Sequence, residues 1–255
     1  MKIRMAVLAA VVVASAAACG PPPPRSSAPS YGVTPEYCPY DDRMVQFNGD
    51  SVGVHTAARL HLPEYSVFNA AQGGAGWVFD DVVSTIPSRV RQWIDQCGVP
   101  GVVVIEGGIN DLTHAIAVEE LQAEARSLSD WLEARGVPTI WVAVHPMAFA
   151  SAYWFAQDNR VAYNEWLLTS GEVWGTTVDC TAALEEPSQP DSLRSAFFTY
   201  LDIWGNVDGI HMNGDGYDAL ARCLEPQIRA AMAGGRPAGR ATRSPAPHGT
   251  GDEGA

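Results

Sequence analysis

The sequence predicts an α/β fold: a three-layer α/β/α sandwich around a five-stranded parallel sheet. Short runs rich in β-branched residues alternate with longer amphipathic stretches, which is typical of βα units. Apolar runs such as Val102–Ile105 suit strands that are buried on both faces. No internal repeat is detectable in this alternation. The combination favours a flavodoxin-like arrangement within one domain.

Each predicted strand is followed by a predicted helix. In chain order the elements are the strand Met44–Asn48, the helix Ser51–Leu60, the strand Ser66–Asn69, the helix Asp81–Cys97, the strand Gly101–Glu106, the helix Val118–Arg135, the strand Thr139–His145, the helix Asn159–Thr169, the weaker strand Val173–Val178 and the helix Asp215–Met232. The helix predicted from Val118 illustrates the criteria. Its apolar residues recur at helical spacing, and Gly136 and Pro138 end it.

The first residues, Met1–Ala18, are typical of an export signal. Lys2 and Arg4 precede an apolar run that is too short to span a bilayer. Residues 16–18 form an A-x-A cleavage site, while Cys19 stands where a bacterial lipoprotein carries its lipidated cysteine. We therefore expect an exported protein that is either secreted or attached to the outer face of the cell membrane through Cys19.

The two ends of the remaining chain lack the pattern of a packed core. Residues 19–36 are rich in Pro and Ser and predict an extended stalk. Residues 233–255 show no apolar periodicity and predict a disordered tail. The folded domain is accordingly expected over residues 37–232, a usual domain size.

The charge and the motif content exclude some functions. The formal net charge is −13, so no basic patch is available for nucleic acid. No G-x-G-x-x-G dinucleotide pattern is present. We expect no cofactor and no metal, and nothing in the sequence indicates the oligomeric state.

Besides Cys19, the chain has four cysteines, Cys38, Cys97, Cys180 and Cys223. In an exported protein the leading interpretation is two disulfides, for which three pairings are open. A metal site is the alternative, but no two of these cysteines have the C-x-x-C spacing of zinc sites.

The segment QFNGDSVG, residues 46–53, places Ser51 directly after the first predicted strand. Gly49 and Gly53 let the chain turn sharply and present Ser51 at a helix N-terminus, where backbone N–H groups stabilise a developing anion. Two other interpretations are open. Ser51 can be a helix N-cap, and the segment also fits the G-x-S-x-G nucleophile pattern of α/β-hydrolases.

Three further motifs follow predicted strands or precede the last helix. Gly74 lies in a glycine-rich turn after the second strand, and Gly73 is its alternative. Asn110 lies in G-x-N-D after the third strand, with an Asx turn as the ordinary interpretation. Asp208 and His211 form D-x-x-H, whose spacing in a turn lets the carboxylate hold the imidazole ring.

In this order, GDS, a glycine turn, G-x-N-D and D-x-x-H resemble the SGNH (GDSL-type) hydrolase family over about residues 43–232. The resemblance implies a three-layer sandwich and a serine esterase or lipase. It makes the G-x-S-x-G match incidental, because an α/β-hydrolase nucleophile usually comes after several strands and its acid is well separated from its histidine.

The resemblance also implies roles for the matched residues. Ser51 would be the nucleophile, His211 the base, and Asp208 the acid that orients His211. The oxyanion hole would be formed by the N–H groups of Ser51 and Gly74 and the side-chain amide of Asn110. Asp50 and Asp111 have no evident catalytic partner, and we expect each to tie its turn to neighbouring backbone.

Aromatic residues and histidine are candidates to line the substrate site. Trp77 follows the glycine turn, His145 ends the fourth strand, and Trp204 precedes D-x-x-H. Buried packing is the commoner use of such side chains. Because an export signal is also predicted, we expect an esterase that acts on small acyl esters of envelope glycans or lipids. An acyltransferase to a sugar hydroxyl and a non-catalytic envelope-binding lipoprotein are the alternatives.

Overall fold

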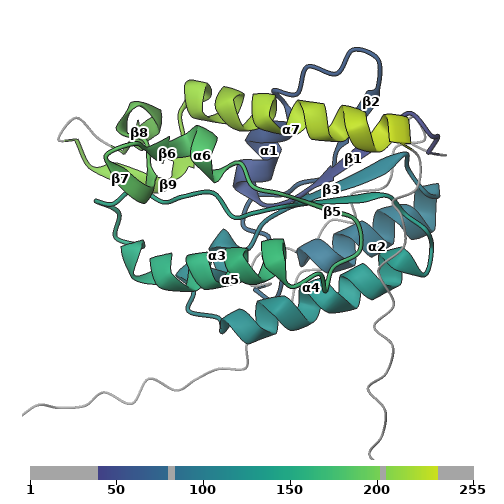
Figure 1. Cartoon of the computed structure of the whole chain (residues 1–255), viewed down its shortest axis with the longest axis horizontal. Coiled ribbons are helices and arrows are strands. Elements are labelled where there is room, and N and C mark those ends of the chain that lie inside the picture. The colour runs from purple at the N-terminus through teal and green to yellow at the C-terminus, as the bar shows by residue number, and fades with distance from the viewer. Residues whose placement is uncertain (1–39, 80–83, 202–204, 235–255) are drawn as a thin grey trace, which may run out of the picture. The chain divides into compact units, whose positions relative to one another are not determined.

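The computed structural model describes residues 40–79, 84–201 and 205–234 (Figure 1). The predicted export signal, Cys19, the whole predicted stalk, most of the predicted tail, Cys38 and Trp204 lie outside these residues. Five parallel strands form the main sheet in the order β2-β1-β3-β4-β5. This is the flavodoxin-like order, so the predicted fold class is confirmed.

The strands of this sheet lie close to their predicted positions. They are β1 (Met44–Asn48), β2 (Ser66–Asn69), β3 (Val102–Glu106), β4 (Thr139–Val142) and β5 (Thr176–Val178). Val45 of β1 is in register with Val67 on one side and with Val102 on the other. Every residue of β3 is buried, because this central strand is covered on both faces.

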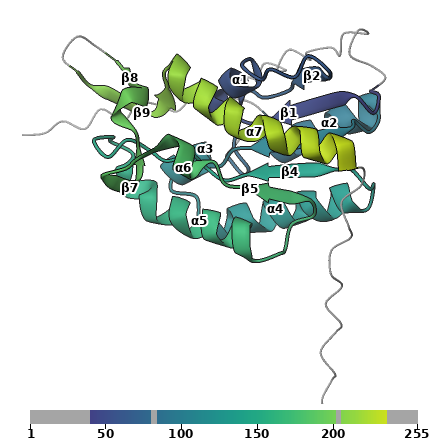
Figure 2. The same ribbon diagram turned by 45° about the horizontal axis from the view of Figure 1, so that its top comes forward.

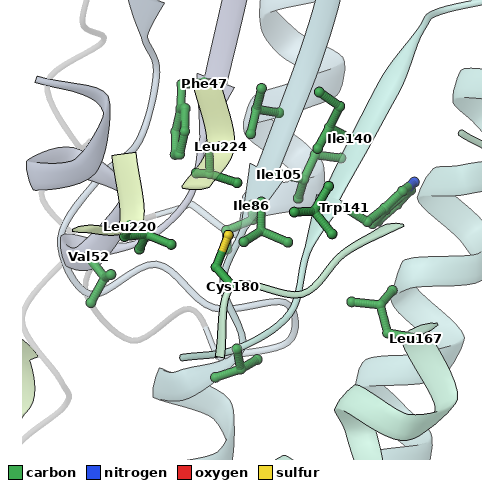
Figure 3. Close-up of a cluster of buried hydrophobic side chains, with 14 of the residues drawn as sticks. Phe47, Val52, Ile86, Ile105, Ile140, Trp141, Leu167, Cys180, Leu220 and Leu224 are labelled. Atoms are coloured by element: carbon green, nitrogen blue, oxygen red, sulfur yellow. The ribbon is translucent and has the colours of Figure 1, made fainter. Parts of the chain in front are cut away.

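Helices cover both faces of the sheet. Both views place α1 (Ser51–Ala57) and α7 (Gly214–Gly234) on one face, and α2 (Ile86–Cys97), α4 (Val118–Glu133) and α5 (Gln157–Thr169) on the other (Figures 1 and 2). Figure 3 shows part of the core, to which α7 contributes Leu220 and Leu224. The sheet thereby presents the carboxyl ends of its strands at one edge, where α1 begins.

Several short elements were not predicted from the sequence. They are α3 (Ile109–Thr113), α6 (Thr181–Leu184), the 3-10 turns η2 (Trp154–Ala156) and η3 (Ser195–Phe197), the hairpin of β6 (Glu185–Glu186) and β7 (Gln189–Leu193), and the hairpin of β8 (Phe198–Tyr200) and β9 (Val207–Met212). Except for β9, these elements are too short to show a periodic apolar pattern.

Four predicted boundaries were wrong by three or more residues. The strand expected to reach His145 ends at Val142, the strand expected from Val173 begins at Thr176, and the first helix ends at Ala57 instead of Leu60. The second helix begins only at Ile86, because the Thr85 side chain accepts a hydrogen bond from the Ser88 N–H and caps it. No helix in the described part of the chain is long and apolar enough to cross a membrane.

Cysteine pairing is resolved for one disulfide. Cys180 is bonded to Cys223 of α7, across a sequence separation of 43 residues. Figure 3 shows Cys180 among the core side chains. Cys97 is also disulfide-bonded, and its partner lies outside the described residues. The Cys180–Cys223 bond fixes the segment after β5 to the last helix.

Candidate active site

Ser51 is the first residue of α1, directly after the turn that follows β1. The N-cap of this helix is Asp50, whose Oδ1 accepts a hydrogen bond from the Val52 N–H at 2.8 Å. Ser51 therefore does not cap the helix, and the capping interpretation of this serine is wrong. Its Oγ lies 2.7 Å from Nε2 of His211 instead.

Asp208 and His211 lie on β9, where the sequence predicted a turn. Alternation along a strand would put these two side chains on opposite faces. Gly209 between them has φ +85°, which breaks the alternation. As a result, Asp208 Oδ1 accepts hydrogen bonds from His211 Nδ1 at 2.9 Å and from the His211 backbone N–H at 2.7 Å.

The surroundings of Asp208 favour its ionised form. Partial burial alone would raise the pKa of this carboxyl, but the His211 N–H groups, the charge of His211 and the Ile210 N–H together hold it below its ordinary value. The Ile210 N–H donates to the same Oδ1 at 3.1 Å. Asp208 is thus a fixed anion beside Nδ1 of His211.

Two of the predicted oxyanion-hole donors, the Asn110 side-chain amide and the Gly74 backbone N–H, come from segments that follow β3 and β2. Asn110 lies in α3 after β3, and its Nδ2 donates to the Ala75 carbonyl at 2.8 Å. An amide nitrogen has two hydrogens, so one remains for a ligand. Gly74 has φ +81°, while a Cβ on Gly73 would lie 3.8 Å from the Ser51 Cβ. Gly73 thus adjoins the nucleophile turn, and Gly74 is the next residue of the same loop.

Asp111 holds the glycine loop in place. Its buried carboxylate accepts hydrogen bonds from the backbone N–H groups of Trp77, Val78 and Phe79 at 2.8 to 2.9 Å. Burial raises the pKa of Asp111, and these three donors oppose the rise. Asp50 ties its turn to the Val52 N–H, and Asp111 ties its turn to the backbone after the glycine loop, as the sequence predicted.

Two of the predicted substrate-lining residues are core residues. Trp77 is 3% exposed, stacks on Trp141 at 5.8 Å and donates from Nε1 to the Gly107 carbonyl. His145 is 2% exposed and contacts the Ile210 carbonyl. The prediction that Trp77 and His145 line the substrate site is therefore wrong, because apolar packing and backbone contacts account for both side chains.

Sequence reasoning gave no role to Glu106, although it is the one charged residue in the apolar run VVVIE of β3. It lies 1% exposed beneath the turn that carries Ser51. An acid at the end of a fully apolar strand was the available signal.

Two hollows lie away from this constellation, at the α5 side of the β6–β7 hairpin. Their volumes are about 260 and 470 Å³, and Asp191 lines both. Arg160 at the wall of the smaller hollow is paired with Asp191 and with backbone carbonyls. Neither hollow is lined by Ser51, Asp208 or His211, so neither is part of the constellation around Ser51.

Known structures share this fold at low sequence identity. A GDSL-like lipase from Bacteroides thetaiotaomicron is 19% identical, with a TM-score of 0.56 over 74% of this chain and 89% of that one. A carbohydrate acetylesterase family member from Sinorhizobium meliloti is 14% identical, with a TM-score of 0.50 over 75% and 99%. The OSK domain of Drosophila Oskar is 12% identical, with a TM-score of 0.54 over 76% and 92%.

The sequence itself matches one family. No curated protein matches the chain. The model of the GDSL-like lipase/acylhydrolase family matches residues 31–219, a segment that includes Ser51, Gly74, Asn110, Asp208 and His211. The chain therefore belongs to the GDSL-like lipase/acylhydrolase family of ester hydrolases.

Proposed function

We propose that this protein is an exported serine esterase that hydrolyses small acyl esters of envelope glycans through a Ser51–His211–Asp208 acyl-enzyme mechanism. The observation that carries the proposal is the continuous hydrogen-bonded chain from Ser51 Oγ through both ring nitrogens of His211 to Asp208. A binding module has no evident need for a nucleophile, base and orienting acid in this order.

The acid fixes the form of the base. Asp208 is an anion that can only accept, so Nδ1 of His211 carries the hydrogen of their 2.9 Å contact. In neutral His211, Nε2 is then the unprotonated nitrogen, and it faces Ser51 Oγ at 2.7 Å. Ser51 thus donates its hydrogen toward the atom that removes it during attack.

Acylation and deacylation each transfer one proton through Nε2. Ser51 Oγ attacks the ester carbonyl carbon as its proton moves to His211. The resulting tetrahedral oxyanion collapses, the bond to the alcohol oxygen breaks, and His211 returns the proton to the alcohol. Water then attacks the acyl-enzyme by the same route and releases the carboxylic acid and free Ser51.

Three donors would stabilise the oxyanion: the backbone N–H of Ser51 at the start of α1, the N–H of Gly74 and the free hydrogen on Asn110 Nδ2. Each such donor lowers the barrier by roughly 3 kcal/mol in enzymes where it has been removed. The bond from Asn110 to the Ala75 carbonyl holds the amide before substrate binds, so little reorganisation is needed.

Exposed aromatic side chains in a loop that contacts the triad segment favour a sugar ester. Phe149, Tyr153 and Phe155 are exposed in the loop after β4. This loop contacts the triad segment, because the Ala148 N–H donates to the Gly209 carbonyl at 3.0 Å. Aromatic rings stack on sugar faces, and one structural neighbour is a carbohydrate acetylesterase family member.

The substrate class is tested by hydrolysis rates on two series, acetylated oligosaccharides and p-nitrophenyl esters of increasing chain length. We expect acetyl and other short esters to be preferred, and Phe155→Ala to raise KM for acetylated sugars more than for p-nitrophenyl acetate. A preference for long acyl chains would contradict the glycan assignment. Acyl transfer to an added acceptor sugar, in place of release to water, would indicate a transferase.

Export and anchoring form a separate part of the proposal, and the sequence of residues 1–19 supports it. Metabolic labelling with palmitate of wild type and Cys19→Ser separates the two modes. Label in wild type alone indicates an anchored lipoprotein, and unlabelled protein in the medium indicates secretion after cleavage at residue 18. Retention of both proteins in the cytoplasm would contradict export.

A further inference from the structure

Glu106, the last residue of β3, is a carboxylic acid in the core. Its side chain is 1% exposed, and neither oxygen forms a hydrogen bond of standard geometry within the described residues. Burying an acid without partners is costly, so such a group calls for an explanation. The mechanism proposed above does not use Glu106.

The carboxyl lies directly beneath the turn that carries Ser51. A Cβ added to Gly49 would lie 3.0 Å from Oε2 of Glu106, and a Cβ added to Gly53 would lie 3.1 Å from the same oxygen. Both distances are shorter than ordinary carbon–oxygen contacts. The two glycines around Ser51 therefore make room for the Glu106 side chain.

The other carboxyl oxygen faces His145, which leads to the second half of the triad. Glu106 Oε1 lies 3.8 Å from Nδ1 of His145. Nε2 of the same ring lies 3.0 Å from the Ile210 carbonyl. Ile210 lies between Asp208 and His211, and its N–H donates to Asp208. Glu106 and His145, here called the buried pair, thus connect the Ser51 turn to the acid–base segment.

Hydrogen-bonding rules determine where the protons are in the buried pair. A carbonyl oxygen only accepts, so Nε2 of His145 must carry a hydrogen to bind Ile210. Burial lowers the pKa of His145 and keeps the ring neutral. Its Nδ1 is therefore an unprotonated acceptor, and the complementary group opposite it is a protonated carboxyl.

Glu106 has the environment to remain protonated at neutral pH. Burial raises its pKa to about 8, and the nearby N–H of Gly53 offsets only part of the rise. Asp50 is fully buried as well; burial raises the pKa of Asp50, and a charge on Glu106 raises it further. Two buried carboxylates that interact in this way do not both ionise without cost.

Among the described residues, the other titratable groups around the cluster do not supply a compensating cation next to Glu106. From α7, Tyr217 places a buried hydroxyl that has no hydrogen-bond partner among the described residues. The charge of Arg160 lowers the pKa of His145, and the charge of Asp208 raises it. The charge of His211 lowers the pKa of Asp50. A carboxylate at Glu106 would thus face Asp50 and the bare nitrogen of His145.

From this geometry we propose that the buried pair is a proton-dependent positioning device, which holds the Ser51 turn and the Asp208–His211 segment in catalytic register while the Glu106 carboxyl opposite His145 is protonated. The inference rests on the proposed serine esterase function. Ionisation of Glu106 sets a carboxylate against the lone pair of Nδ1 without a compensating proton, so the two halves of the triad lose their common support and kcat falls.

The matched variants are Glu106→Gln and Glu120→Gln. Glu106→Gln keeps polar hydrogens opposite His145 but cannot ionise, while Glu120 is an exposed acid in the first turn of α4. Wild type and Glu120→Gln should lose kcat by about tenfold per pH unit above about pH 8. Glu106→Gln should keep at least a third of the wild-type kcat at pH 7 and show no decline up to pH 9.5. An alkaline decline that Glu106→Gln leaves unchanged overturns the proposal.

A second variant covers the event that Glu106→Gln does not fold. His145→Gln keeps a donor for the Ile210 carbonyl and removes the acceptor that favours protonated Glu106. The alkaline midpoint of kcat should then move to lower pH, with KM little changed. An unchanged midpoint overturns the proposal.

A stability measurement tests the buried proton without any ester. Because the pKa of Glu106 is raised from 4.5 to about 8 on folding, the folded protein retains a proton that the unfolded chain releases. Between these two pKa values, the folding equilibrium constant of wild type, relative to that of Glu106→Gln, should fall by up to about tenfold per pH unit. Above about pH 8 the ratio should level off. A difference that is independent of pH overturns the proposal. Should wild type hydrolyse no ester, the proposed function fails while this measurement still decides the protonation of Glu106.

Discussion

The Asp50 carboxylate accepts the Val52 N–H at 2.8 Å and caps α1, and this contact frees the neighbouring hydroxyl of Ser51 to meet His211. The turn needs both functions within two residues, because a serine that capped its own helix would point its oxygen at the backbone. The GDS order therefore assigns the acid to structure and the serine to chemistry.

Replacing Asp50 should damage both stability and activity. Asp50→Ala removes the cap and should lower the free energy of unfolding by about 1 kcal/mol. It also frees the Val52 N–H, so kcat should fall at least tenfold as the Ser51 turn loosens. Denaturant unfolding and steady-state kinetics measure the two effects, and full activity in a destabilised Asp50→Ala protein would contradict the assigned role.

Asn110 should act in the transition state. Asn110→Ala removes both the free amide hydrogen and the bond to the Ala75 carbonyl, so we expect kcat to fall about 10²- to 10³-fold with little change in KM. Thermal unfolding of the variant shows how much of the loss is structural. A variant with raised KM and wild-type kcat would assign Asn110 to substrate binding instead.

Replacing Gly209 tests whether the bend in β9 positions the triad, and replacing Gly205, just before β9, is the matched control. Both have positive φ, +85° and +83°, but a Cβ on Gly209 would lie 2.1 Å from Ser151 Oγ, while a Cβ on Gly205 meets nothing within 4 Å. Each change to alanine should cost about 1–2 kcal/mol for the left-handed backbone. Gly209→Ala should lose further stability and at least tenfold in kcat, because the clash moves Asp208 and His211. Equal activities of the two variants would show that the bend does not position the triad.

The Cys180–Cys223 bond should make a large contribution to stability. It closes a segment with a sequence separation of 43, for which chain entropy gives about 4 kcal/mol. The double variant Cys180→Ala, Cys223→Ala should therefore unfold at clearly lower denaturant concentration, with kcat nearly unchanged because neither sulfur is near the triad contacts. A loss below about 1 kcal/mol would show that the native bond is strained or that the unfolded chain is already compact.

The sheet and the triad positions were predictable because their signals are local. Strands such as β3 are continuous apolar runs, and Ser51, Asn110 and the D-x-x-H pair each lie in a short motif that includes glycine or asparagine. The strand character of β9 was missed because two of its residues, Asp208 and Gly209, have low β propensity. The backbone pairs there through the hairpin with β8, which depends on contacts that no short segment encodes.

Burial was the harder property to predict. Trp77 and His145 were expected at the substrate site because each follows a predicted strand. In the structure Trp77 stacks on Trp141 and His145 contacts the Ile210 carbonyl, and both side chains are buried. Both partners are distant in sequence. The burial of Glu106 was not predicted either, because it depends on the Ser51 turn and on His145, which lie far from Glu106 in the sequence. Side-chain environment is set by tertiary contacts, which apolar periodicity does not contain.

The most direct test of the serine esterase account is covalent labelling by a fluorophosphonate probe. The residue 32–255 protein and its Ser51→Ala and His211→Ala variants are compared, and the labelled peptide is identified by mass spectrometry. The account predicts label on Ser51 in wild type, none in Ser51→Ala and at least a hundredfold slower labelling in His211→Ala. Absence of label in folded wild-type protein, or label on another residue, would contradict it.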